Sequence, residues 1–210
     1  MGCDRGRCIV VRGAADLDTF ARPATRDEAR TRLGLPLDVP IVCFSGLDVL
    51  IDLPLAVHTF EIVRRQLPSA RLLLVGPTLK LAQPMVTDPA TIGAIMALGA
   101  VPYKRLPEVL PAADVFLMPF QNKIANVGRW PNKIGDFMSV GRPVVSNPVG
   151  EVRWLFERYV LGELAEETAE SMAAATLRLL QDPERAAALG QNARMIAEEE
   201  FGVAHQVALL

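Results

Sequence analysis

The chain has 210 residues, and half of them are hydrophobic, so it can bury a substantial core. Its formal net charge of −2 argues against nucleic acid as a partner. No apolar run reaches the roughly 18 residues needed to cross a bilayer, and three cysteines without zinc-ligand spacing fit a reducing cytoplasm.

Short apolar runs alternate with helical patterns from Pro40 onward. Each apolar run is bounded by Gly, Pro or polar residues and predicts a buried strand, over 41–46, 71–77, 99–101, 114–120 and 142–146. The helical patterns predict helices over 54–66, 89–98, 106–114, 132–140, 166–180 and 183–201. Continuous apolar strands separated by helices indicate a parallel sheet covered on both faces. The predicted fold class is therefore α/β, with a doubly wound parallel sheet.

Residues 1–40 depart from this pattern. The stretch CIVVRGAADLDTFARP predicts a strand followed by a polar turn, and DEARTRLGLP predicts a short helix. We interpret residues 1–40 as a linker-like segment packed on one domain of residues 41–210.

A cluster of charges precedes and enters the helix predicted over 132–140. Parallel α/β sheets bind ligands beyond the carboxyl ends of their strands. This helix starts after Pro131, and its first turn would present free N–H groups at that edge. Arg129 and Lys133 add cations there, and Asp136 lies one turn further on the face of Lys133. The pattern favours a diphosphate next to a ribose diol; the alternative is an exposed ion pair worth about 0.2–0.5 kcal/mol.

Several stretches, taken in order, resemble one family. They are VVRGAADLDTFARP, RLLLVG, LGAVPYKRLPEVLPAADVFLMPF, KIGDFMSVGRPVVSNPVGE and ETAESMAAATLRLLQDPERAAALGQNARMIAEEEF. Together they are similar to the C-terminal, nucleotide-sugar-binding half of GT-B glycosyltransferases of the group 1, family 4-like type. The resemblance covers about residues 9–203 and makes the expected domain Rossmann-like.

The resemblance implies a function in polysaccharide biosynthesis. It implies retaining transfer of a sugar, of the hexosyltransferase type, from a nucleotide diphosphate-sugar without a metal cofactor. The acceptor, whether a glycan, a lipid-linked molecule or a small molecule, would be bound by an N-terminal domain that this chain lacks. We therefore expect the isolated chain not to turn over, and peripheral membrane association of the full-length protein is compatible with the family.

The resemblance also assigns positions in the donor site. Asp136 stands where the family usually has a ribose-binding Glu, and Gly46 ends the first strand where a nucleotide comes close to the backbone. Ala100 and Val101 would hold the base through backbone groups. Tyr103 would pack near the base, with a plain surface tyrosine as the alternative. The N–H groups of Val149 and Gly150 are candidates for the diphosphate, although an ordinary strand-to-helix turn fits equally well.

The chain departs from the family pattern at two places. Gly128 replaces the first of two paired Glu residues, and Leu47 replaces an Arg that usually clamps the diphosphate; the Lys that usually follows is also missing. Asn122 or Asn126 could replace the lost Glu. Arg129, Lys133, Lys104 and Arg105 could replace the lost cations, with Lys123 and Arg142 as weaker candidates.

Two alternative functions stay open because of these departures. One is a degenerate, non-catalytic GT-B module kept for binding or assembly, and the other is a sugar-nucleotide epimerase. A metal site at Asp16–Asp18 is disfavoured, since this DLD motif lies at no predicted strand end. His58 and His205 lack partner residues for a zinc site or a hydrolytic triad.

Overall fold

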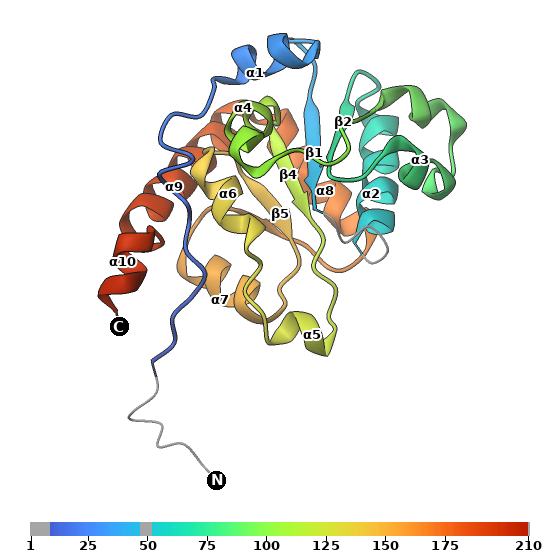
Figure 1. The fold of residues 1–210 in the computed structure, drawn as a ribbon. Helices are drawn as coiled ribbons and strands as arrows, with labels where there is room; N and C mark the ends of the chain where they lie inside the picture. The colour runs from blue at the N-terminus through green and yellow to red at the C-terminus, as the bar shows by residue number, and fades with distance from the viewer. Residues whose placement is uncertain (1–8, 47–51, 210) are drawn as a thin grey trace.

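The computed structural model describes residues 9–46 and 52–209 (Figure 1). Its described residues form a parallel sheet of six strands in the order β3-β2-β1-β4-β5-β6. The strands are β1 (Ile41–Ser45), β2 (Arg71–Val75), β3 (Ile95–Ala97), β4 (Val115–Met118), β5 (Val144–Ser146) and β6 (Gly162–Leu164). This confirms the predicted fold class, a doubly wound parallel α/β sheet.

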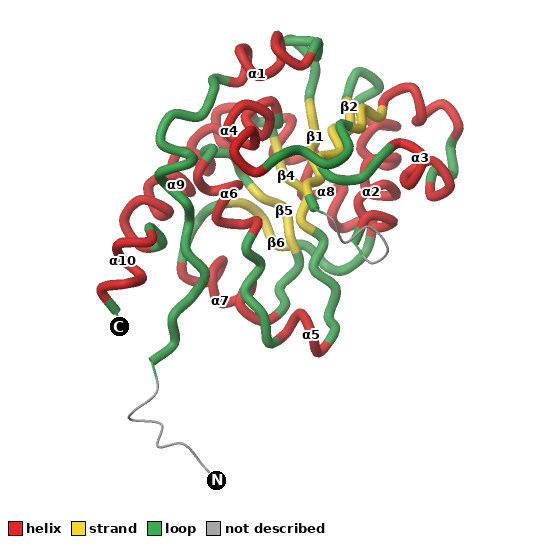
Figure 2. The backbone as a smooth tube through the Cα atoms, in the orientation of Figure 1, coloured by secondary structure: helices red, strands yellow, loops and turns green. Residues whose placement is uncertain are grey.

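Helices cover both faces of the sheet (Figures 1 and 2). They are α1 (Arg26–Leu33), α2 (Leu53–Gln66), α3 (Leu79–Ala82), α4 (Leu106–Val109), α5 (Ile124–Val127), α6 (Lys133–Ser139), α7 (Gly150–Arg158), α8 (Ala169–Gln181), α9 (Pro183–Glu200) and α10 (Val203–Ala208). Helices α2 and α8 pack together on one face, and α6 and α9 pack together on the other. Most of these helices join strands that run in the same direction, as parallel pairing requires.

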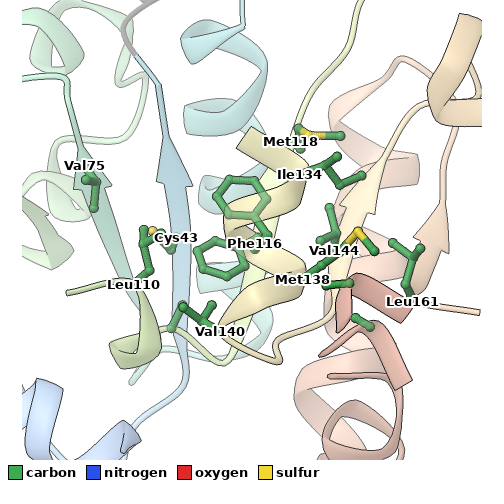
Figure 3. Packing of buried hydrophobic residues seen from close by; sticks show 14 of the residues in the cluster. Cys43, Val75, Leu110, Phe116, Met118, Ile134, Met138, Val140, Val144 and Leu161 are labelled. Carbon is green, nitrogen blue, oxygen red and sulfur yellow. The ribbon is translucent and has the colours of Figure 1, made fainter. Parts of the chain in front are cut away.

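Alternate residues of each strand supply two separate cores. Cys43, Phe116 and Val144 point into the core under α6 and α9, and their neighbours Val42 and Val115 point into the core under α2 and α8. Figure 3 shows the first core, where Phe116 and Val144 of the sheet face Ile134 and Met138 of α6. The ring of Phe116 stacks on that of Phe137, with centroids 4.0 Å apart. This alternation with a period of two residues explains why β1, β2, β4 and β5 are apolar on both faces.

The strand order reverses direction between β1 and β4. Strands β2 and β3 follow on one side of β1, and β4, β5 and β6 follow on the other side. In doubly wound sheets a crevice forms at such a switch point, beyond the carboxyl ends of the strands. The segments that border it here are Gly46 after β1 and residues 119–122 after β4.

Local signals in the sequence define several helix ends. Thr25 and Glu28 form a reciprocal capping box at the start of α1, and Gly34 ends that helix in the left-handed conformation. Thr168 and Asp182 accept hydrogen bonds from the first turns of α8 and α9. These caps explain why the closing helices lie near their predicted bounds.

Two predicted elements are wrong. The helix expected over 89–98 is a 3-10 helix at Pro89–Ala94 that leads directly into β3, and the strand expected over 99–101 lies four residues earlier. Strand β3 pairs with Leu72–Leu74 of β2, and Gly99, at φ +66°, turns the chain after it. The short apolar run fits a helix or a strand by periodicity alone, and pairing with β2 decides between them.

The segment before the sheet is also different from its prediction. Residues 9–14 form no strand, and Ala15 makes an isolated parallel bridge with Gly202. The N–H of Ala15 donates to the carbonyl of Phe201 over 2.7 Å. The segment thus lies along the end of α9 and the start of α10 instead of extending the sheet (Figure 1). None of the helices in 9–46 and 52–209 is long and apolar enough to cross a membrane.

Candidate functional site

Gly46 and Lys133 meet at the switch point of the sheet. Gly46 follows the last residue of β1, and Lys133 is the first residue of α6. A β-carbon added to Gly46 would come within 2.7 Å of Lys133 Nζ. The same ammonium lies 5.5 Å from the centre of the Phe44 ring, which is within the range of a cation–π interaction. A cation is therefore held directly at the carboxyl end of the central strand.

Asp136 lies one turn into α6 and forms the acidic part of the site. The hydroxyl of Tyr103 donates a hydrogen bond to Asp136 Oδ1 over 3.1 Å. Tyr103 itself is 45% exposed and packs edge-on against Phe20, with ring centroids 6.1 Å apart. Asp136 and Tyr103, 33 residues apart in the sequence, are thus brought together as predicted site residues.

The pKa of Asp136 is raised to about 6. Burial of the carboxylate is the main cause, and the negative charge of Asp16 adds to it, while the hydrogen bond from Tyr103 acts in the opposite direction. Asp16 keeps its charge because the backbone N–H of Thr19 bonds to its carboxylate and lowers its pKa. The site therefore holds two acidic groups, one ionised and one that titrates close to neutrality.

Ala100 and Val101 lie in the loop between β3 and Tyr103. Ala100 is exposed and Val101 is half-buried against the core. The loop begins at Gly99, whose carbonyl accepts a hydrogen bond from the N–H of Gly76 over 2.7 Å. This contact joins the loops that follow β2 and β3, so both residues lie at the carboxyl edge of the sheet.

Arg129 has its own partners beyond the end of β4. Its Nε donates to Asn126 Oδ1 over 2.8 Å, and its guanidinium lies 4.9 Å from the centre of the Phe120 ring. Asn126 is buried and also donates to the carbonyl of Gln121. Arg129 and Asn126 therefore link α5 to the segment that precedes α6.

Val149 and Gly150 form the start of α7. The N–H of Val149 donates to the carbonyl of Asn147 over 2.8 Å, so this group already has a partner. Gly150 has φ +51°, and a β-carbon there would lie 2.5 Å from the carbonyl oxygen of Val127. The loop carrying α5 therefore lies directly against this turn between β5 and α7.

The structure corrects one candidate substitute cation. Arg142 lies two residues before β5, at the amino end of the sheet, where it donates to the carbonyl of Ala113 over 2.9 Å. It cannot reach a ligand at the carboxyl edge. Lys104 and Arg105 are exposed on the 3-10 turn that starts at Tyr103 and stay near that edge. Leu47 lies outside the described residues.

Asp16 and Phe44 were missed as site residues in the sequence. Asp16 belongs to the DLD motif, which the sequence relates only to metal binding, and it approaches a partner far along the chain in Asp136. Phe44 has the pattern of an ordinary core residue of β1. A contact at such separations leaves no local pattern in the sequence, so only the fold could reveal it.

The arrangement suits a ligand with an anionic and a hydroxylated part. Lys133 offers a cation next to the glycine at the end of β1, and Asp136 offers carboxylate oxygens about one helical turn, roughly 5 Å, further along α6. Tyr103 adds an aromatic ring beside the carboxylate. Within 9–46 and 52–209, no group of three or more His, Cys, Asp or Glu residues could hold a metal ion.

The fold defines a class of architecture, the Rossmann-like half of the GT-B type. Solved structures of this type match the chain closely in fold. UDP- and glucose-bound HepE from Anabaena matches 99% of the chain and 56% of its own length, with a TM-score of 0.76 and 19% identity. The C-terminal domain of a group 1 glycosyltransferase, LpcC from Francisella tularensis, matches 90% of the chain and 98% of that structure, with a TM-score of 0.72 and 16% identity.

Comparison of the amino-acid sequence with known proteins shows the family of the chain. Residues 40–182 match the family model for glycosyl transferases group 1, and the chain belongs to this family. A D-inositol 3-phosphate glycosyltransferase from Xylanimonas cellulosilytica is 30% identical over 96% of the chain and 49% of the relative. A GDP-mannose-dependent mannosyltransferase from Mycolicibacterium smegmatis, described as acting on a phosphatidylinositol monomannoside, is 29% identical over 83% of the chain and 47% of the relative. The chain thus spans about half the length of these relatives.

Proposed function

We propose that this chain is the donor-binding, C-terminal half of a retaining glycosyltransferase. It would bind a nucleotide diphosphate-sugar at the carboxyl edge of the sheet and transfer the hexose to an acceptor held by an N-terminal domain. The observation that carries the proposal is Lys133 Nζ beside Gly46, at the switch point, with Asp136 one turn further on the same helix. The HepE structures with UDP and UDP-glucose support the nucleotide-sugar as the class of ligand.

The chemistry of the proposed site follows from charge. The ammonium of Lys133 would stabilise the diphosphate as negative charge develops on it during departure from the sugar. The ionised carboxylate of Asp136 would accept hydrogen bonds from the two ribose hydroxyls, and the loop of Ala100 and Val101 would border the base. The site is proposed to work without a metal ion, so EDTA should leave nucleotide affinity unchanged.

Titration calorimetry with UDP, GDP, UDP-glucose and GDP-mannose tests the proposal. Binding of at least one of these ligands is expected, and Asp136→Ala should weaken it by about 1–3 kcal/mol, the range for hydrogen bonds to a charged group. Glu157→Ala, which removes an exposed carboxylate near the far end of α7, is the matched control. No binding at millimolar nucleotide by a folded chain would reject donor binding and favour a non-catalytic module.

Lys133 has a separate test. Because its ammonium is proposed to contact the diphosphate, Lys133→Ala should weaken UDP more than uridine. Lys80→Ala, an exposed lysine on α3, serves as the control for a general loss of positive charge. Equal losses for UDP and uridine would contradict a phosphate contact even if donor binding itself holds.

A further inference from the structure

A cavity of about 370 Å³ lies at the edge of the sheet opposite the proposed donor site. Its lining includes Pro40, Asp114 and Pro143, which immediately precede β1, β4 and β5. A strand of five residues spans about 16 Å, so the sheet itself separates this cavity from Lys133 and Asp136. Its volume falls within the roughly 300–1,000 Å³ of small-molecule sites.

One wall of the cavity is apolar. Leu179 and Leu180 come from the last turn of α8, and Ala186 and Ala187 come from the first turns of α9. The link between the two helices is fixed by Asp182, whose side chain accepts from the N–H of Arg185. The wall is therefore formed by two capped helices and is ready to contact an apolar group without rearrangement.

The other wall carries guanidinium groups around one carboxylate. Asp114 accepts hydrogen bonds from Arg26 over 2.8 Å, from Arg30 over 2.7 Å and from the N–H of Ile41 over 2.7 Å. Both of its oxygens are therefore already in use. Arg30 is completely buried, and its charge is compensated mainly by Asp114, with carbonyl groups such as that of Ala112 accepting its hydrogen bonds.

Arg142 lines the same cavity and hydrogen-bonds to backbone carbonyls. It donates to Ala113 over 2.9 Å and, through longer contacts of 3.3 and 3.4 Å, to Gly141 and Pro111. A guanidinium carries five N–H groups, so donors remain on Arg142. Burial lowers the pKa of Arg142, as expected for a cation whose desolvation is incompletely offset.

The buried part of this wall has more positive than negative charge. Buried Arg30 and half-buried Arg142 lie near the half-buried carboxylate of Asp114, while Asp27, which pairs with Arg26 over 3.0 Å, and Asp38 are exposed to solvent. Exposed carboxylates are screened by water and salt and offset a buried cation poorly. A ligand that brings an anion into the cavity would supply the missing charge.

We infer that this cavity binds a small amphipathic anion. Its carboxylate or phosphate head would contact the guanidinium groups of Arg26 and Arg142, and its short apolar body would lie against Leu179, Leu180 and Ala186. Planar guanidinium groups suit both kinds of head. This site is independent of the proposed donor site, since it shares no residue with it.

Amide shifts of the isotope-labelled 210-residue chain test the inference. Octanoate, octyl phosphate and octanol are titrated separately at millimolar concentration. Saturable shifts are expected at Val39, Arg142, Leu180 and Ala187 with at least one anion, and the comparison of octanoate with octyl phosphate identifies the preferred head. Octanol, which has the same apolar body without charge, should bind about tenfold more weakly. Equal affinity for octanol, or no saturable shift at these residues, would overturn the inference.

Two variants locate the ligand. Arg142→Gln should reduce the affinity for the anion by about tenfold, and Arg153→Gln, an exposed arginine on α7, is the matched control. Should Arg142→Gln fail to fold, Ala187→Phe decides the question, because it adds a ring at an exposed cavity-lining residue and should abolish binding. Unchanged binding in Ala187→Phe would contradict a site in this cavity. UDP shifts at the opposite edge are recorded in the same samples, so failure of either site is recognised separately.

Discussion

Asp136 is a carboxylate in a site that resists its ionisation. Its burial and the nearby charge of Asp16 raise its pKa to about 6, and Tyr103 opposes this shift through its hydrogen bond. The protein thus maintains a carboxylate whose charge costs stability. Such a cost is common where a polar group is retained for binding rather than for folding.

Asp136→Asn should raise the stability of the chain near neutral pH. The pKa of Asp136 in the folded state, about 6, lies above the ordinary value of 3.8. Protonated Asp136 therefore contributes its full share to the free energy of unfolding below pH 3.8, and this contribution is lost as the pH rises through 6. The variant lacks this titration, and its free energy of unfolding should exceed that of the wild type by about 1–2 kcal/mol above pH 7. Urea unfolding from pH 4 to 8 measures this, with the exposed Asp18→Asn as control; a gain that does not vary with pH would contradict it.

Nucleotide affinity should fall as pH drops below about 6, because protonated Asp136 cannot accept hydrogen bonds from both ribose hydroxyls. Tyr103→Phe removes a group that lowers the pKa of Asp136, so the midpoint of this fall should move to higher pH. Asp16→Asn removes a neighbouring negative charge and should move the midpoint to lower pH. Calorimetry at several pH values measures both midpoints. Shifts in the same direction in the two variants would show that another group controls the titration.

Part of the site could be predicted at the level of residues. Lys133 and Asp136 are neighbours on one helix, so helical spacing after a proline is sufficient to associate them. Asp16 approaches Asp136 only because the fold brings the first segment to α6. Arg129, also predicted at the start of α6, donates a hydrogen bond to Asn126 of α5, and its contact with a ligand remains a prediction.

The end of α5 packs so closely against the first residue of α7 that only glycine fits at this position. Gly150 has a left-handed φ of +51°, and a β-carbon added there would lie only 2.5 Å from the Val127 carbonyl oxygen. Gly150→Ala should therefore reduce the free energy of unfolding by about 1–3 kcal/mol from backbone strain, or displace α5. Gly93→Ala is the matched control, because a β-carbon there meets no atom within 4 Å. Chemical denaturation compares them, and equal stabilities would contradict the close approach.

Helix α1 is fixed to the sheet through Arg30. Its guanidinium reaches the carbonyls of Leu37, Val39 and Ala112 and the carboxylate of Asp114. Arg30→Ala should cost about 3–5 kcal/mol, since it removes the buried partner of the Arg30–Asp114 ion pair and also leaves the Ala112 carbonyl without this donor. Arg32→Ala, whose exposed side chain lies 3.5 Å from Glu108, should change stability by less than about 0.5 kcal/mol. Thermal unfolding distinguishes the two, and similar melting temperatures would reject this role.

Elements were predictable where their local signals were strong. Strands β1, β2, β4 and β5 are short apolar runs bounded by turn residues, and α8 and α9 carry caps and apolar faces. Strand β6 was missed because Gly162–Leu164 contains one apolar residue among three, and its pairing with Val144–Ser146 defines it as a strand. Strand β3 was displaced for a similar reason, since pairing with β2 decides its bounds.

At the scale of the whole molecule, the described residues form a sheet of six strands, while the chain spans about half the length of its relatives. We expect the 210-residue chain to bind a nucleotide-sugar weakly without transferring the sugar, because the proposed acceptor site belongs to another domain. A sugar-transfer assay with candidate acceptors, with and without an added N-terminal domain of a relative, measures this. Robust transfer by the chain alone would contradict the division of roles.

The alternation of strands and helices in the sequence predicts the direction of the strands but not their order in the sheet. The sequence indicates a parallel sheet, since β1, β2, β4 and β5 are apolar on both faces, but it does not show which strand lies at the centre. The structure places β1 and β4 side by side, and this neighbourhood creates the crevice. The position of the proposed site is thus a property of the topology, whereas Lys133 and Asp136 are visible in the sequence.

The bridge between Ala15 and Gly202 brings the two end segments of the described chain together, which makes the protein suitable for circular permutation. The segment before the sheet lies beside the segment that follows α9, and Val10 and Leu209 line the same cavity of about 200 Å³. A short flexible peptide could therefore join residue 209 to residue 9, and new ends could be opened in the exposed turn at Pro68–Ser69. Such a circular permutant should keep all six strands in their places, because their order in space does not depend on where the chain begins.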